Sequence, residues 1–147
     1  MTPTAHPTRV TRRSLALLGL ATLAMTAGCS AQATPDPLRI SLEEGRQLFE
    51  SKQVVMFDIR EPDEHATGVA NGAQLLPVSQ LNQRAGEIPK DPAQPVLIIC
   101  NTQNRSSKVV QAMKEAGWTN VRYVHGGMSG WAEKGWPTIK PFGLPKS

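Results

Sequence analysis

Short apolar runs alternate with amphipathic stretches along most of this chain of 147 residues. The clearest runs, 54–57 and 96–99, are continuously apolar, as expected for strands that are covered on both faces of a sheet. Other, shorter runs of the same kind recur along the chain between turn signals. We therefore predict strands at residues 38–40, 54–57, 74–78, 96–99 and 121–124.

The stretches between these runs carry helix signals. Ser41 and Glu44 have the spacing of a capping box and precede a mostly apolar helical face. Pro62 suits the first turn of a short helix, and Gly117 acts as the C-terminal stop of a longer one. The predicted helical segments are the one that starts at Ser41 and residues 61–64, 79–87, 106–116 and 129–134.

Strands that alternate with helices predict an α/β fold with a mainly parallel central sheet. Because the clearest strands are apolar on both faces, helices should flank the sheet on both sides. About 110 residues follow this pattern, enough for one modest core. We expect a single domain at residues 38–140 and a tail at 141–147; an α+β arrangement is the alternative.

The N-terminal segment has a different pattern. Its apolar run, Leu15–Ala27, follows three arginines that are the only charged side chains before Cys29. A positive region, an apolar run and small residues before a cleavage point predict a signal peptide at residues 1–28. The run is shorter than the roughly 20 apolar residues that span a bilayer, which disfavours the alternative of a permanent anchor. Arg12 and Arg13 resemble a twin-arginine export signal, but ordinary signal-peptide charge explains them equally.

The residues around Cys29 resemble a bacterial lipobox, in which the cysteine receives lipid and becomes the mature N-terminus. The match, Thr26–Cys29, implies that Cys29 is the lipidation site and that residues 29–37 form an extended tether. Several acyl chains on one N-terminus give stable anchoring. Ser30 resembles a signal for the outer membrane rather than the inner one. We expect an exported, periplasm-facing protein that is anchored to a bacterial membrane by its N-terminal lipid.

Charge and cysteine content narrow the function. The 16 basic and 12 acidic side chains give a net charge of +4, which falls to +1 without the three arginines of the leader. A nearly neutral domain lacks the basic stripe that nucleic-acid binding requires, so we expect no nucleic-acid partner. Once Cys29 carries lipid, Cys100 has no partner for an internal disulfide. Cys100 is then either a reactive thiol or a buried, inert one.

The residues after Cys100 favour a reactive thiol. The segment Cys100–Ser106 lies between a buried strand and a helix, at the strand end where open α/β sheets bind ligands. Main-chain amides of such a loop, together with the start of the helix, place N–H donors and positive potential around one point. These donors and the charge of Arg105 favour thiolate over thiol, which activates the sulfur without a histidine base. His125 is the alternative base.

Four segments, taken in order, resemble the rhodanese family. Cys100–Ser106 is similar to the family's C-x-x-G-x-R-S loop, and Asp58–Glu64 is similar to its D-V-R-x-x-x-E segment. Gly68–Ala73 resembles G-H-I-x-G-A, and Gly126–Pro137 resembles the closing G-G-x-x-x-W-x-x-x-G-x-P. The order and the spacing hold over about residues 40–138, which is nearly all of the predicted domain.

The resemblance implies a sulfurtransferase that needs no metal and no other cofactor. Cys100 would attack the outer sulfur of a thiosulfate-type anion and would then carry it as a persulfide. A thiol or cyanide, or a protein that accepts sulfur, would take it away. The loop between Cys100 and Arg105 is one residue shorter than in related phosphatases, which favours sulfur over phosphate. The implied substrate-binding residues are Asn101, Thr102, Gln103, Asn104, Arg105 and Ser106.

Some residues near the predicted site need separate consideration, because their role is open or because they differ from the family pattern. Arg105 either orients the anionic donor or forms an ion pair that stabilises the loop. Asp58 and Arg60 are expected to be structural, with Asp58 holding main-chain N–H groups or Arg60. Gln103 stands where the family has glycine, so a left-handed backbone there would be strained. Val69 stands where the family often has histidine.

Two other classes of function fit the same sequence. The domain could be a binding module in which Cys100 is incidental, an idea that the tether and Gln103 support. It could also be a redox protein that cycles Cys100 through sulfenic acid or a mixed disulfide. Sulfur loading of Cys100 from thiosulfate separates the enzyme from both alternatives.

Overall fold

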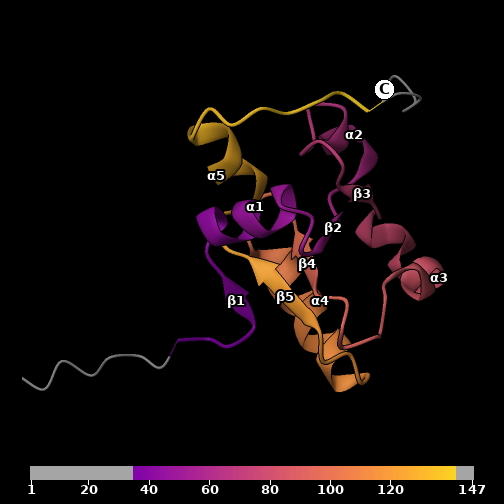
Figure 1. Ribbon diagram of the computed structural model, residues 1–147. Helices are drawn as coiled ribbons and strands as arrows, with labels where there is room; N and C mark the ends of the chain where they lie inside the picture. The colour runs from indigo at the N-terminus through magenta and orange to yellow at the C-terminus, as the bar shows by residue number, and fades with distance from the viewer. Residues whose placement is uncertain (1–34, 142–147) are drawn as a thin grey trace, which may run out of the picture. The chain divides into compact units, whose positions relative to one another are not determined.

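The computed structural model of the protein describes residues 35–141 (Figure 1). The predicted signal peptide, Cys29 and most of the predicted tether and tail lie outside the described residues. Within the described range, no helix has both the length and the apolar character needed to cross a membrane.

The central sheet has five strands in the order β1-β5-β4-β2-β3. All four neighbouring pairs are parallel, which confirms the predicted mainly parallel sheet. β4 lies in the middle, so the residue that follows it emerges between the ends of two other strands. The strands are β1 Arg39–Ile40, β2 Val55–Asp58, β3 Gln74–Leu75, β4 Val96–Ile99 and β5 Val121–Val124.

Helices cover both faces of the sheet, as predicted. Figure 1 shows α1 in front of the strands and α4 behind them. The α-helices are α1 Leu42–Glu50, α2 Pro62–His65, α3 Leu81–Arg84, α4 Asn104–Glu115 and α5 Gly127–Glu133, and two 3₁₀ turns, η1 Val78–Gln80 and η2 Ala85–Glu87, flank α3.

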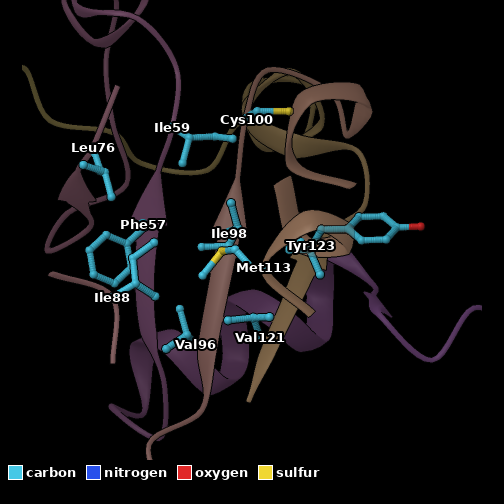
Figure 2. Close-up of a cluster of buried hydrophobic side chains, with 11 residues drawn as sticks. Phe57, Ile59, Leu76, Ile88, Val96, Ile98, Cys100, Met113, Val121 and Tyr123 are labelled. Atoms are coloured by element: carbon cyan, nitrogen blue, oxygen red, sulfur yellow. The ribbon is translucent and has the colours of Figure 1, made fainter. Parts of the chain in front are cut away.

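Alternate strand residues pack in two separate hydrophobic clusters, because successive side chains of a strand point to opposite faces of the sheet. On the α4 side, Ile98 of β4 packs in one cluster with Met113 of the helix (Figure 2), and Val110 of the same helix belongs to this cluster. On the other side, Leu97 of β4 packs in a second cluster with Trp131 of α5. β4 is therefore packed on both faces, and this packing holds its carboxyl end in a fixed position.

The region after β2 departs from the predicted elements. The strand predicted at 74–78 covers only Gln74–Leu75, and the helix predicted at 79–87 is split into η1, α3 and η2. Pro77 has no N–H to donate and has a φ of −50°, so the chain leaves the sheet there and enters the first 3₁₀ turn. Gly86 lies inside η2, and glycine is a poor helix former.

Helix boundaries near the site also differ from the prediction. α4 begins at Asn104 rather than Ser106, because the amide of Ser107 already donates to the carbonyl of Gln103 at 2.8 Å. α5 begins at Gly127 rather than Ser129. The predicted capping box of α1 is only half formed. Ser41 Oγ accepts from the Glu44 amide, while the Glu44 carboxylate lies 3.8 Å from Arg122.

Candidate functional site

Cys100 follows β4 directly and is at the centre of the candidate site. The residue is 1% exposed and belongs to the core cluster on the α4 side. Figure 2 shows its sulfur at the end of the strand, beyond the aliphatic side chains of that cluster. The sulfur lies 3.4 Å from both the amide nitrogen and the Oγ of Ser106, in the first turn of α4. The strand and the helix therefore fix the sulfur from two directions.

The carbonyl groups of the loop after Cys100 are held by the start of α5. The Met128 amide donates to the Cys100 carbonyl at 2.9 Å, and the Ser129 amide donates to the Asn101 carbonyl at 2.8 Å. Ser129 Oγ also donates to Asn101 Oδ1 at 3.0 Å. In a trans peptide the N–H points opposite to the C=O. The amides that follow these two carbonyls therefore face away from α5.

These amides are the free donors of the site. Within residues 35–141, no protein acceptor takes the main-chain N–H of any residue from 101 to 105. The last of them belong to the first turn of α4, a helix of 12 residues, where donors are unpaired and the helix dipole is positive. Together they make an electropositive cradle at the end of β4, suited to an anion.

Gly127 makes the close contact between the loop and α5 feasible. Its φ of +55° lies in the left-handed region, which glycine adopts without strain. A Cβ atom at this position would clash with the carbonyl oxygens of Cys100, Asn101 and Thr102. The second glycine of the Gly126-Gly127 pair is therefore required by the backbone of the Cys100 loop.

Arg105 forms a two-point ion pair with Glu64 of α2. Its Nη1 and Nη2 lie 2.6 and 2.5 Å from the two carboxylate oxygens. The side chains of Arg105 and Glu64 are 34% and 29% exposed. The hydrogen bond from Arg105 is the main cause that lowers the pKa of Glu64, and the bond with Glu64 raises the pKa of Arg105. Of the two roles predicted for Arg105, the ion pair is therefore present in the structure. The guanidinium keeps its positive charge beside the free amides.

A second, buried ion pair lies at the end of β2. Arg60 contacts Asp58 through Nε at 3.0 Å and Nη2 at 2.7 Å, and its amide donates to Asp58 Oδ1. Arg60 Nη2 also donates to the Gly68 carbonyl at 2.7 Å. Burial alone would raise the pKa of Asp58, but hydrogen bonds from His65 and Arg60 outweigh it and hold this pKa below its ordinary value. Within the described residues, the side chains of this pair bond only groups of residues 58–68, which is consistent with the predicted structural role.

Gln103 does not adopt the left-handed backbone that would strain it. Its φ is −159°, and among the described residues Lys52 is the only non-glycine with a positive φ. The strain expected of a glutamine in the left-handed region is therefore absent at this position.

The structure brings the predicted site residues together around one sulfur. Asn101, Thr102, Gln103, Asn104 and Arg105 supply the free amides, and Ser106 contacts the sulfur. The role of each toward a substrate stays a prediction. No hydrogen bond in the described part of the chain joins Cys100 to a histidine.

Sequence reasoning did not assign a role to Glu64 or Ser129, although both lie in the motifs quoted above. Glu64 pairs with a residue 41 positions away, and Ser129 lies 28 positions from Asn101. Spacing along the chain gives no signal for such partners. The acidic end of the D-x-R-x-x-x-E segment was the one available hint.

Comparisons with known proteins agree with this geometry. The rhodanese-like domain model matches residues 41–134. A curated protein of Allochromatium vinosum named Sulfurtransferase is 34% identical over 98 residues, covering 67% of this chain and 90% of that protein. The uncharacterized protein slr1261 of Synechocystis is 29% identical over 117 residues, which cover 80% of this chain. The match spans 64% of slr1261, less than two thirds of its length.

A solved structure gives the same picture of the fold. The human single-domain sulfurtransferase TSTD1 superposes with a TM-score of 0.59 at 28% identity, covering 67% of this chain and 98% of that one. The segment that the family model matches, residues 41–134, contains the cradle, the two ion pairs and Gly127.

Proposed function

The chain belongs to the rhodanese-like domain family, and from that premise we propose that it is a sulfurtransferase that works through a persulfide on Cys100. The donor is a thiosulfate-type anion, and the acceptor is a thiol or cyanide. The observation that carries the proposal is the set of free amides at residues 101–105 beside the sulfur of Cys100. An array of this kind stabilises an anionic nucleophile and an anionic product alike.

The first half-reaction loads the sulfur. The Cys100 thiolate attacks the outer sulfur of the donor, a new S–S bond forms, and the old S–S bond breaks. Sulfite leaves with the electron pair of the broken bond, so no external oxidant or reductant is required. The amides hold the donor's charge as it approaches and then the charge of the persulfide.

The second half-reaction transfers the terminal sulfur of the Cys100 persulfide to the acceptor. Cyanide or a thiolate attacks the terminal sulfur of the persulfide, and the Cys100 thiolate leaves with the electrons of the broken S–S bond. The acceptor becomes thiocyanate or a persulfide of its own. Because Cys100 is 1% exposed, only a small or narrow acceptor group can reach the sulfur in this conformation. A protein acceptor would therefore present a thiol on an extended segment.

Intact mass measurement tests the reaction on the purified full chain in detergent. After incubation with thiosulfate, the wild type should gain the mass of one sulfur atom, and Cys100→Ser should gain none. Cyanide should then remove the added mass and release thiocyanate. Loading that is absent in the wild type, with no cyanide turnover, would support a binding module instead. A peroxide-dependent oxygen adduct without sulfur loading would support a redox protein.

The proposal includes the membrane anchor. The lipobox-like segment Thr26–Cys29 motivates a lipid on Cys29, with the domain facing the periplasm and the outer membrane favoured over the inner one. Cells that express the full chain and are fed a labelled fatty acid should label the wild type but not Cys29→Ser. A wild-type protein without label, or label retained in Cys29→Ser, would count against the anchor and would leave the chemistry of Cys100 untouched.

A further inference from the structure

Gln103 connects the Cys100 loop to the turn between β5 and α5. Its side-chain Oε1 accepts a hydrogen bond from the main-chain amide of Gly126 at 3.3 Å. Within residues 35–141, this is the single acceptor for the Gly126 amide. Gly126 has a φ of +80°, so its position is set by the turn and not by a regular element. The side chain therefore satisfies a donor that the turn itself leaves open.

This bond adds to the contacts that hold the loop against α5. Met128 and Ser129 fix the carbonyls of Cys100 and Asn101 at the first end of the loop. Gln103 fixes the other end, where the loop enters α4. The main chain of Gln103 is bonded inside the helix start, because its carbonyl accepts from Ser107 at 2.8 Å and from Ser106 Oγ at 3.2 Å. The free amides lie between these two fixed ends.

We propose that Gln103 is a positioning residue, a clamp that keeps the amides of the Cys100 loop converged before the donor arrives. The inference rests on the proposed function, and it names the feature that sets the affinity for the donor. Glycine at this position, as the family pattern has it, offers no side chain to bond Gly126. The glutamine exchanges the conformational freedom of a glycine for a fixed contact with the turn.

Loss of the clamp should affect donor binding more than turnover. A loop that converges only part of the time binds its anion more weakly by that fraction. Once bound, the anion itself holds the amides together, so the chemical step is preserved. Removal of one neutral hydrogen bond corresponds to an increase in the KM for thiosulfate of about threefold to tenfold, with kcat within about twofold of the wild type.

The test compares two substitutions at position 103 with a matched control. Gln103→Met removes the acceptor at similar volume, and Gln103→Glu keeps an acceptor but adds a negative charge. Gln111→Met is the control, because Gln111 is exposed on α4 and, among the residues that the structure describes, its side chain bonds only Glu115. Each full-chain variant is measured for hydrogen exchange at the Gly126 amide and for the KM and kcat with thiosulfate.

The clamp predicts a pattern across these variants. Gly126 should exchange several-fold faster in Gln103→Met but stay protected in Gln103→Glu and in Gln111→Met. The KM should rise in Gln103→Met, and in Gln103→Glu it should rise at low salt and recover as salt screens the added charge. Unchanged Gly126 exchange in Gln103→Met, or an unchanged KM alongside faster exchange, would overturn the inference. If the wild type loads no sulfur, the proposed function fails, while Gly126 exchange still decides whether the clamp exists.

Discussion

The segments that follow β2 and β4 start beside each other at the same edge of the sheet, and each holds an arginine bonded to a carboxylate: Arg60 in the loop after β2, and Arg105 in the first turn of α4. After β2, Arg60 and Asp58 are 4% and 0% exposed, and each of the three guanidinium nitrogens donates to a protein acceptor. After β4, Arg105 and Glu64 are 34% and 29% exposed, and the neighbouring amides are unpaired.

The difference shows that one of the two adjacent segments supports the site and the other has donors available for a ligand. A loop whose donors are all satisfied internally has nothing left for a ligand and acts as a support. A loop whose carbonyls are bonded and whose amides are free is poised to bind an anion. The sulfur of Cys100 lies in the second loop, and the first one, through Glu64 of α2, holds the arginine beside it.

The largest effect is expected from breaking the buried pair. Asp58→Asn leaves Arg60 buried without a counter-charge, which should lower the free energy of unfolding by about 3–5 kcal/mol. Urea unfolding followed by circular dichroism measures the loss. Asp63→Asn is the matched control, because Asp63 is exposed in the neighbouring helix α2, and it should change stability by less than about 0.5 kcal/mol. Equal effects of the two substitutions would contradict the structural role of Asp58.

A smaller loss of stability, with a large loss of activity, is expected at Gly127. Gly127→Ala forces the loop away from α5, because the added Cβ meets the carbonyls of Cys100, Asn101 and Thr102. We expect a cost of about 2 kcal/mol or more and little sulfur loading by intact mass. Gly135→Ala is the control, since its φ is +64° but nothing lies within 4 Å of its Cβ. Gly135→Ala should lower stability only through its positive φ, and Cys100 should still gain one sulfur atom. If this control also fails to gain sulfur, the loss of activity in Gly127→Ala cannot be assigned to the contact between α5 and the Cys100 loop.

The partly exposed pair should matter less to stability than to the reaction. Arg105→Met should cost about 0.5–1 kcal/mol of unfolding free energy, since solvent screens such pairs. Its kcat/KM for thiosulfate should fall about tenfold, as expected for a charged group beside an anion. Arg84→Met breaks the similar Arg84–Glu87 pair, 2.6 Å long and remote from the cradle, and should leave kcat/KM unchanged. If kcat/KM for thiosulfate in Arg105→Met equals that of the wild type, Arg105 has only a structural role.

The smallest effect is a dependence of stability on acid pH. The bond from Arg105 holds the pKa of Glu64 below 4.5 in the folded chain. Its stabilisation is therefore present above pH 4.5 and is lost as the pH falls through the folded value. The contribution should stay below about 1 kcal/mol because the pair is partly exposed. Denaturant unfolding between pH 7 and pH 3 should show a shallower loss in Glu64→Gln than in the wild type, and identical slopes would refute the assignment.

Asp58 should show a pH dependence of the same sign. Its pKa is held below 3.8 despite burial, because hydrogen bonds from His65 and Arg60 favour the carboxylate. Its stabilisation is therefore present above the ordinary pKa of an aspartate and is lost as the pH falls through the folded value.

Much of the fold could be read from local pattern. The apolar runs at 96–99 and 121–124 became β4 and β5 with the predicted bounds, because buried strands carry their own signal. Elements with mixed signals were less predictable: Pro77 ended a strand early, and the helix expected at 79–87 broke into three short turns. Pro77 and Gly86 mark these breaks, and the prediction gave the apolar pattern around them more weight than these two residues.

The chain's sequence by itself determined that Cys100 follows a buried strand and precedes a helix, since hydrophobic periodicity and turn residues are local properties. Only the tertiary structure decided which groups surround the sulfur. The strand order brings α5 against the loop carbonyls and brings α2 within reach of Arg105, through contacts 28 and 41 residues apart. Such pairings are consequences of three-dimensional packing, and that is why the free amides of the cradle became visible only there.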